Sequence, residues 1–177
     1  SNFASILNAM DGSELETIDV SGNSLGGPAC GHALKALTDR SRHLIDLNFS
    51  DVGVTDDLAA AVIDACRGRP MIKLKAAKNR LGEKSARAVA TWDFTAIQEI
   101  DLSWNEIGSA GAGGLCQSLE HCGEQGATKT GLSVLDIRSA RNTPKTSDND
   151  PKRSARDPKR SDDDRAHFKH CRFVIWR

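Results

Sequence analysis

Apolar and polar residues alternate in short segments of this 177-residue chain, and each segment is followed by a stretch in which apolar residues recur every three or four positions. In IQEIDLSWNEIG, residues 97–108, alternation places Ile100 and Leu102 on one face, and an Asn and a Gly follow. A period of two predicts a short β-strand with one buried face. The later spacing of Ala112, Leu115 and Leu119 predicts a helix with one apolar stripe.

The same strand-then-helix pattern recurs along the chain. Units start at residues 15, 44, 71, 97 and 132, so successive starts lie 29, 27, 26 and 35 residues apart. Each unit places two apolar strand residues two positions apart, at 18/20, 47/49, 74/76, 100/102 and 135/137. Such spacing is typical of a repeat array. Because one strand and one helix cannot bury their apolar faces alone, we expect the units to stack and their strands to form one parallel sheet.

The pattern L-x-x-L-x-L-x-x-N-x-L with a helical second half resembles the leucine-rich repeat, and the long second halves resemble the ribonuclease-inhibitor-like subclass. The resemblance covers roughly residues 4 to 139. It implies an α/β fold, a leucine-rich-repeat solenoid with a curved parallel sheet inside and helices outside. It also implies that Asn23, Asn79 and Asn105 bond backbone groups of the turn that leaves each strand, where unpaired buried groups are costly.

Two units depart from this pattern, and three glycines follow it. Val52 and Ala140 stand where the other units have Asn, so the loop geometry of units two and five is not predicted. The glycines are expected at turns into the helices, where a side chain would crowd; they are Gly26, Gly82 and Gly108.

Charge divides the chain into two parts. Residues 1–140 carry 13 Lys and Arg against 18 Asp and Glu, a balance of −5, whereas residues 141–177 carry 11 against 6, a balance of +5. Residues 141–166 contain no large apolar residue and hold two copies of DPKRS. We therefore expect a disordered charged tail over 141–177. The array over 1–140 would hold about four full units plus partial ends. Its start, FASILNAM, resembles the end of an earlier repeat's helix, which indicates a fragment.

The final residues, HFKHCRFVIWR, are apolar and basic and match no repeat. Two interpretations stay open: a docking peptide, or an artefact of gene-model translation.

The positions of the cysteines and the lack of a recognisable targeting pattern indicate a reduced compartment. Cys30, Cys66 and Cys116 fall on helical positions of the repeat, where a free thiol acts as a small apolar residue. No run of about 18 apolar residues and no signal-peptide pattern occurs in the sequence. We therefore expect a cytoplasmic protein, with a nuclear location as the alternative.

Candidate catalytic and metal-binding chemistry is sparse. Two groups could be considered for a metal site, but their spacing matches no zinc pattern; they are His121-Cys122 and His167 with His170-Cys171. The pairs Lys152-Arg153 and Lys159-Arg160 would form a nuclear-import or nucleic-acid patch, but interleaved aspartates weaken it. No nucleophile with a neighbouring base, no phosphate-binding Gly-Lys loop and no paired acid motif is found. We predict no enzyme and no cofactor.

The remaining candidate surface is the concave face, which carries two outward residues per strand. Because neighbouring strands lie about 4.8 Å apart, Lys73 should lie between Asp46 and Glu99. Five acids would face two lysines, and Trp104 would be exposed just past the fourth strand. A simple alternative is an ion-pair ladder that contributes little. The outward residues are Thr17, Asp19, Asp46, Asn48, Lys73, Lys75, Glu99, Asp101, Val134 and Asp136.

The sequence thus predicts a non-enzymatic protein-interaction scaffold that binds a protein partner of basic character, with no membrane, nucleic-acid or small-molecule partner. Two alternatives come from the resemblance: a regulator of the GTPase-activating type, and the ligand-sensing repeat domain of a larger nucleotide-binding receptor. The predicted partner-binding residues are Asp19, Asn48, Lys73, Lys75, Glu99, Asp101, Trp104 and Asp136.

Overall fold

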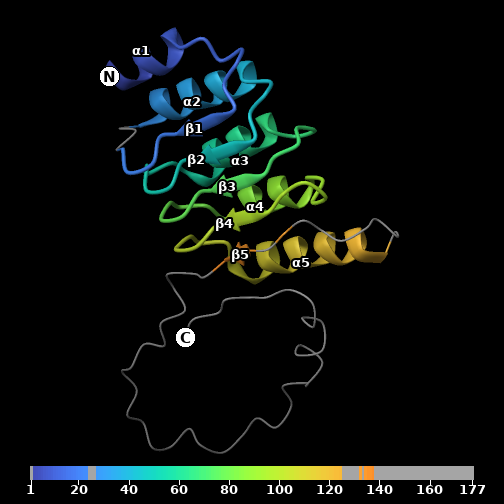
Figure 1. Cartoon of the computed structure of the whole chain (residues 1–177). Coiled ribbons are helices and arrows are strands. Elements are labelled where there is room, and N and C mark those ends of the chain that lie inside the picture. Colours follow the sequence, from blue (N-terminus) through green and yellow to red (C-terminus); the bar gives the residue numbers. More distant parts are fainter. Residues whose placement is uncertain (1, 24–26, 125–131, 133, 138–177) are drawn as a thin grey trace, which may run out of the picture.

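A computed structural model of the chain describes residues 2–23, 27–124, 132 and 134–137, without the side chains of residue 2 and residues 120–124. The boundary predicted at residue 140 and the tail over 141–177 lie outside the described residues. Helices and strands alternate along the chain (Figure 1). They are α1 (Asn2–Ala9), β1 (Thr17–Asp19), α2 (Pro28–Arg40), β2 (Asp46–Asn48), α3 (Asp56–Ala65), β3 (Lys73–Lys75), α4 (Glu83–Ala90), β4 (Glu99–Asp101), α5 (Gly108–Glu124) and β5 (Val134–Asp136).

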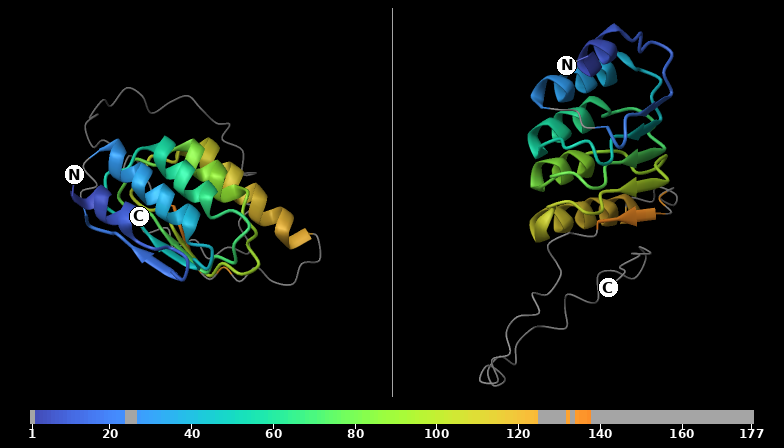
Figure 2. Two further views of the ribbon diagram at one scale, coloured as in Figure 1. Left: turned by 90° about the horizontal axis from the view of Figure 1, so that it is seen from above. Right: turned by 90° about the vertical axis from the view of Figure 1, so that its left-hand side faces the viewer.

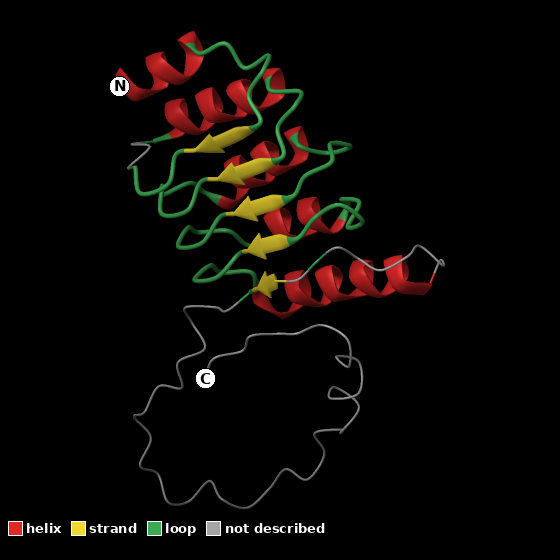
Figure 3. Cartoon of the chain, viewed as in Figure 1, coloured by secondary structure: helices red, strands yellow, loops and turns green. Residues whose placement is uncertain are grey.

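The strands form one parallel sheet in sequence order, β1-β2-β3-β4-β5, and each pairs with the next without a register shift. All five arrows point the same way in Figure 3. The right-hand view in Figure 2 shows helices on one side of the molecule and strands on the other, so the chain has two layers. The α/β class and the parallel sheet are confirmed, and each strand lies within one residue of its predicted place.

The core lies between the sheet and the helices. The central residue of every strand points into it, and the register aligns these side chains in one row across the sheet. The helices face this row with the predicted apolar stripe, including Leu34, Val62, Val89 and Leu115. Each fully buried side chain of this size contributes roughly 1.5–3 kcal/mol to folding. The strand row is Ile18, Leu47, Leu74, Ile100 and Leu135, all 5% exposed or less.

The predicted asparagines bond the turns that leave the strands, and two of them also join neighbouring units. Asn79 donates through Nδ2 to the carbonyls of Ala76 and Ala77 in its own turn. Its Oδ1 accepts from the backbone N–H groups of Val52 and Gly53 in the preceding unit, at 3.2 and 3.0 Å. This satisfies buried backbone groups that have no strand partner. Val52 therefore does not disturb the loop of unit two, because the next unit's asparagine supplies the bonds.

Charged side chains cap helices that belong to the neighbouring unit. Asp56 accepts through Oδ1 from the backbone N–H groups of Gly82 and Ser85 at 2.7 and 2.9 Å, and so caps the start of α4. Arg69 donates to the carbonyls of Thr38 and Asp39 at the end of α2, at 2.8 and 3.3 Å. Both contacts place a charge where the helix dipole favours it. They tie α3 to α4, and the segment after α3 to α2.

The predicted glycines have two different physical roles. A Cβ added at Gly82 would lie 3.0 Å from Asp56 Oδ2, so this position is crowded as expected. Gly108 has a φ of 70°, and an added Cβ would meet no atom within 4 Å, so its role is conformational and the crowding expected there is wrong. Gly26 lies outside the described residues.

Candidate functional site

The sheet face that the helices leave uncovered is called the open face here (Figure 2). The first and third residues of each strand point toward it, and the central residue points away, as the burial of the strands shows. The register confirms the predicted neighbours, since Lys73 pairs with Asp46 on one side and with Glu99 on the other. One row holds Thr17, Asp46, Lys73, Glu99 and Val134, and the second row holds Asp19, Asn48, Lys75, Asp101 and Asp136.

Three residues of the second row also hold the turns at which their strands end. Asp101 Oδ1 accepts from the backbone N–H of Ser103 at 2.9 Å, and Asn48 Oδ1 accepts from that of Ser50 at 3.1 Å. Asp19 makes the same bond to the N–H of Ser21 at 2.9 Å. A side chain that accepts from the backbone N–H two residues further along the chain forms an Asx turn. The second row therefore has a structural role in addition to the binding role predicted for it.

Electrostatic contacts across the open face are local. The hydroxyl and the N–H of Ser21 lower the pKa of Asp19, with smaller contributions from Asn48 and Lys75. Asn48 Nδ2 donates to Asp19 Oδ2 at 3.0 Å. Lys75 Nζ lies 3.3 Å from Glu99 Oε1, so this lysine pairs diagonally, with the neighbouring row. Lys75 keeps 36% of its side-chain surface exposed in that pair, so the contact is weak in water.

Trp104 lies at the edge where the strands end, in the turn that follows β4. It is 50% exposed, as predicted, and its φ is 59°. The equivalent residues of the earlier turns are Gly22, Asp51 and Lys78, with φ values of 69°, 56° and 55°. A bulky residue rarely adopts this left-handed conformation, which costs roughly 1 kcal/mol or more. Neighbouring Ser103 and Asn105 are 3% and 1% exposed, so a rigid turn holds Trp104 at this edge.

The structure thus brings most of the predicted partner-binding residues together and sets one apart. Seven of them lie on the open face, on five adjacent strands: Asp19, Asn48, Lys73, Lys75, Glu99, Asp101 and Asp136. Trp104 lies beyond the strand end, at the border of that face. Whether any of them contacts a partner stays a prediction.

The described residues contain no group of three or more His, Cys, Asp or Glu side chains that could hold a metal ion. The side chains of His121 and Cys122, like residues 167–171, lie outside the described part of the chain. In the described helices there is no segment long and apolar enough to cross a membrane. The thiols of Cys30 and Cys66 are buried, and that of Cys116 is half-buried. Burial raises the pKa of Cys66 to about 12.

Comparison with known proteins supports a repeat protein of the kind that the sequence resembles. Residues 95–116, in the fourth unit, match the family model described as a leucine-rich repeat. No curated protein sequence gives a match. These findings and the fold support a leucine-rich repeat protein, whereas the ribonuclease-inhibitor-like subclass stays a prediction.

Solved structures with a similar fold include two at low sequence identity. The structure of "Leiomodin-1 Actin-Binding Site 2" is 9% identical with a TM-score of 0.51, over 67% of this chain and 71% of that chain. The C-terminal domain of tropomodulin from Caenorhabditis elegans is 12% identical with a TM-score of 0.47, over 67% of this chain and 74% of that chain. At 9% identity, the likeness to the leiomodin structure concerns the fold alone.

Several functional details were not predicted from the sequence. One residue in the turn after each of the first four strands has a left-handed φ, and this was not predicted. Gly22, which stands at that position in unit one, could have indicated it. The Asx turns could have been found from the repeated Asp-x-Ser and Asn-x-Ser spacing at 19, 48 and 101. The caps made by Asp56 and Arg69 left no such signal, because they depend on contacts between units.

Proposed function

We propose that this chain is a non-enzymatic protein-interaction domain and that a protein partner of basic character binds the open face, the concave side of a leucine-rich-repeat solenoid. The observation that carries the proposal is the charge of that face. Its two rows hold Lys73 and Lys75 against five acids, which are Asp19, Asp46, Glu99, Asp101 and Asp136. No described helix covers it (Figure 2).

The helical side of the molecule offers a contrast that supports this choice. Several of its charges form exposed ion pairs, among them Lys35 with Asp39 and Arg67 with Asp64, at 2.6 and 2.7 Å. Lys84 pairs there with Asp57. Such pairs reduce the field that a partner meets, whereas an excess of one sign on the open face attracts the opposite sign. Trp104 adds an exposed aromatic side chain, a residue type enriched among strong binding contacts.

The proposed binding mode separates into two kinetic contributions. Charged side chains that stay partly solvated, such as Asp101, mainly set the association rate and its dependence on salt. A desolvated aromatic residue mainly sets the dissociation rate, at a cost of about 2 kcal/mol when it is truncated in a strong contact. Asp101 and Trp104 should therefore change different rate constants.

The test isolates a partner by pull-down with the full chain and measures variants by surface binding kinetics. Asp101→Asn is the matched charge variant, because Asn48 fills the equivalent place and makes the same turn bond. It should slow association and flatten its salt dependence, and Trp104→Ala should speed dissociation. Lys84→Glu and Arg87→Glu, on the helical side, should bind like the parent chain. If these two abolish binding while the first two do not, the open face is not the site.

A further inference from the structure

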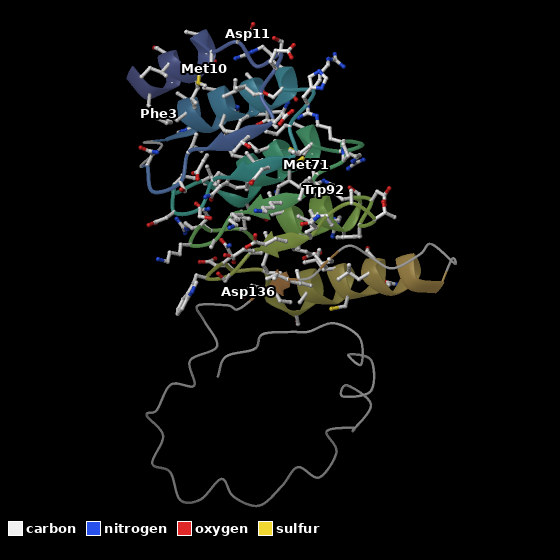
Figure 4. All side chains as sticks on the ribbon, in the orientation of Figure 1. Phe3, Met10, Asp11, Met71, Trp92 and Asp136 are labelled. Atoms are coloured by element: carbon white, nitrogen blue, oxygen red, sulfur yellow. The ribbon has the colours of Figure 1, made fainter. Side chains whose placement is uncertain are left out.

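The open face is not uniform from one end to the other. At its β4–β5 end, Val134 on the face is 39% exposed, and Trp104, at the border just past β4, is 50% exposed. The other large apolar residues that are exposed in the described part of the chain, Ile6 and Met10, lie in or just after α1. Figure 4 shows Met10 and Asp136 at opposite ends of the array. The apolar surface of the open face is therefore concentrated beside β4 and β5.

Carboxylates accompany these apolar side chains. Val134 lies beside Glu99 in the strand register. Two residues further along the same strands, Asp136 lies beside Asp101. Neighbouring strands lie about 4.8 Å apart, so a ligand spanning both strands meets all three acids at once. The ligand that complements this end of the face combines positive charge with large apolar side chains.

The chain itself contains a segment with that chemistry. Residues 165–177, RAHFKHCRFVIWR, hold four Lys and Arg and no Asp or Glu. Basic residues at 169 and 172 are followed at once by four large apolar residues, at 173–176, and then by Arg177. The repeat array does not use these residues, since they match no repeat unit. Among residues 141–177 they are the segment that offers both kinds of side chain.

The length of chain between the two parts allows them to meet. β5 ends at Asp136 on the open face, and 28 residues, 137–164, separate it from the basic segment. A random coil of about that many residues has a root-mean-square span of roughly 30 Å. Five strands span about 19 Å. A tether of this kind gives an effective concentration on the order of 1 mM, so even weak contacts would hold the segment in place.

We propose that residues 165–177 bind the β4–β5 end of the open face of the same chain, with their basic side chains on Glu99, Asp101 and Asp136 and their apolar residues on Trp104 and Val134. This inference rests on the proposed function, because it assigns an occupant to the same face. An external basic partner must then displace the chain's own segment. The segment acts as an intramolecular competitor for the site.

Zero-length cross-linking of the full chain tests the placement. A carbodiimide joins Lys169 Nζ to a carboxylate in direct contact, forming an amide with loss of water, which the reagent takes up as it becomes a urea. Mass spectrometry should find Lys169 joined to Glu99, Asp101 or Asp136, and these products should decline at high salt. Equal yields with Asp39 and Asp64, on the helical side, would overturn the proposal. So would products that join isotopically labelled to unlabelled chains, because they would show binding between copies.

A competition experiment tests occupancy. The probe is a fluorescent synthetic peptide of residues 165–177, added to the full chain. The double variant Lys169→Glu with Arg172→Glu should bind the probe about tenfold tighter than the parent chain, since its own segment no longer fills the site. Lys152→Glu with Arg153→Glu makes the same charge change outside the segment and should bind like the parent. Equal affinity for all three chains would overturn the inference.

A second probe separates this inference from the proposed function. It keeps the charges of residues 165–177 and replaces the five large apolar residues, Phe168, Phe173, Val174, Ile175 and Trp176, by serine. If both probes bind equally and Asp101→Asn weakens both, the open face binds basic ligands but not this segment in particular, and the inference fails alone. If neither probe binds any of the chains, the inference and the proposed function fail together.

Discussion

The side-chain oxygen of Asn105 lies 3.0 Å from the backbone nitrogen of Asn79, the equivalent asparagine of the preceding unit, and accepts its hydrogen bond. The same oxygen accepts from the N–H of Leu81 at 3.1 Å. The Nδ2 of Asn105 donates to three carbonyls, those of Ala76, Leu102 and Ser103. One side chain thus satisfies five backbone groups in two units, and this links the rigidity of the turn that carries Trp104 to the stacking of the array.

Asn105→Ala should therefore be strongly destabilising. Leaving one buried polar group unpaired costs roughly 1–3 kcal/mol, so we expect a loss of at least about 3 kcal/mol of unfolding free energy. Asn23→Ala is the matched control. Asn23 is exposed and bonds two carbonyls of its own turn, so it should cost about 1 kcal/mol or less. Urea denaturation measures both, and similar midpoints for the two variants would contradict the inter-unit role of Asn105.

Asp56 should make the array sensitive to acid. Burial raises the pKa of Asp56, but hydrogen bonds from Ser85, Gly82 and Lys84 together outweigh it and leave the pKa below its ordinary value. A lowered folded-state pKa contributes stability above the unfolded-state pKa, and this stability is lost as pH falls through the folded-state value. Asp56→Ala should cost about 2 kcal/mol at pH 7, because the start of α4 loses its cap.

Asp56→Ala should also lose less unfolding free energy between neutral and acid pH than the parent chain does. Asp57→Ala provides the control, because Asp57 is exposed and pairs with Lys84 on the surface. We expect that control to change stability by less than about 0.5 kcal/mol. Chemical denaturation at a series of pH values below 7 tests this, and parallel pH profiles for the parent chain and Asp56→Ala would rule the cap out as a source of acid sensitivity.

At position 104 the usual order of stability of the glycine and alanine variants should be reversed. At an ordinary position glycine is less stable than alanine by about 0.5–1 kcal/mol. The φ of Trp104 is 59°, where alanine is strained and glycine is not, so Trp104→Gly should be more stable than Trp104→Ala by about 1 kcal/mol. Lys84, an exposed residue in α4, should show the ordinary order. Thermal unfolding of the four variants measures the comparison, and an ordinary order at both positions would show that the turn carries no strain.

Cys66 should be chemically inert in the folded chain. Its pKa of about 12 and its 1% exposure leave almost no thiolate at pH 8 and no access for a reagent. Cys116 is half-buried and should react with iodoacetamide faster than Cys66. Both should react at similar rates in concentrated urea. Mass spectrometry after timed labelling gives the rates, and early modification of Cys66 under native conditions would show that the C-terminal end of α3 opens locally.

The sequence by itself determined the repeating strand and helix and the direction in which each strand residue points. The alternation at Ile100 and Leu102 and the spacing of Leu115 and Leu119 were sufficient, because burial of one face imposes a period on the chain that local sequence records. The pairing of Lys73 with Asp46 and Glu99 followed from equal strand offsets in successive units. The exposure of Trp104 followed in the same way from the position of the framework residues.

Contacts between units were decided by the tertiary structure. Asp56 caps a helix that begins 27 residues later, and Arg69 bonds a helix that ended 29 residues earlier, so neither role is visible in a local pattern. The left-handed φ of Trp104 is imposed by the turn that Asn105 holds, against the residue's own preference. A local pattern records which face of an element is buried. Which atoms meet between units depends on the geometry of stacking, which no single unit contains.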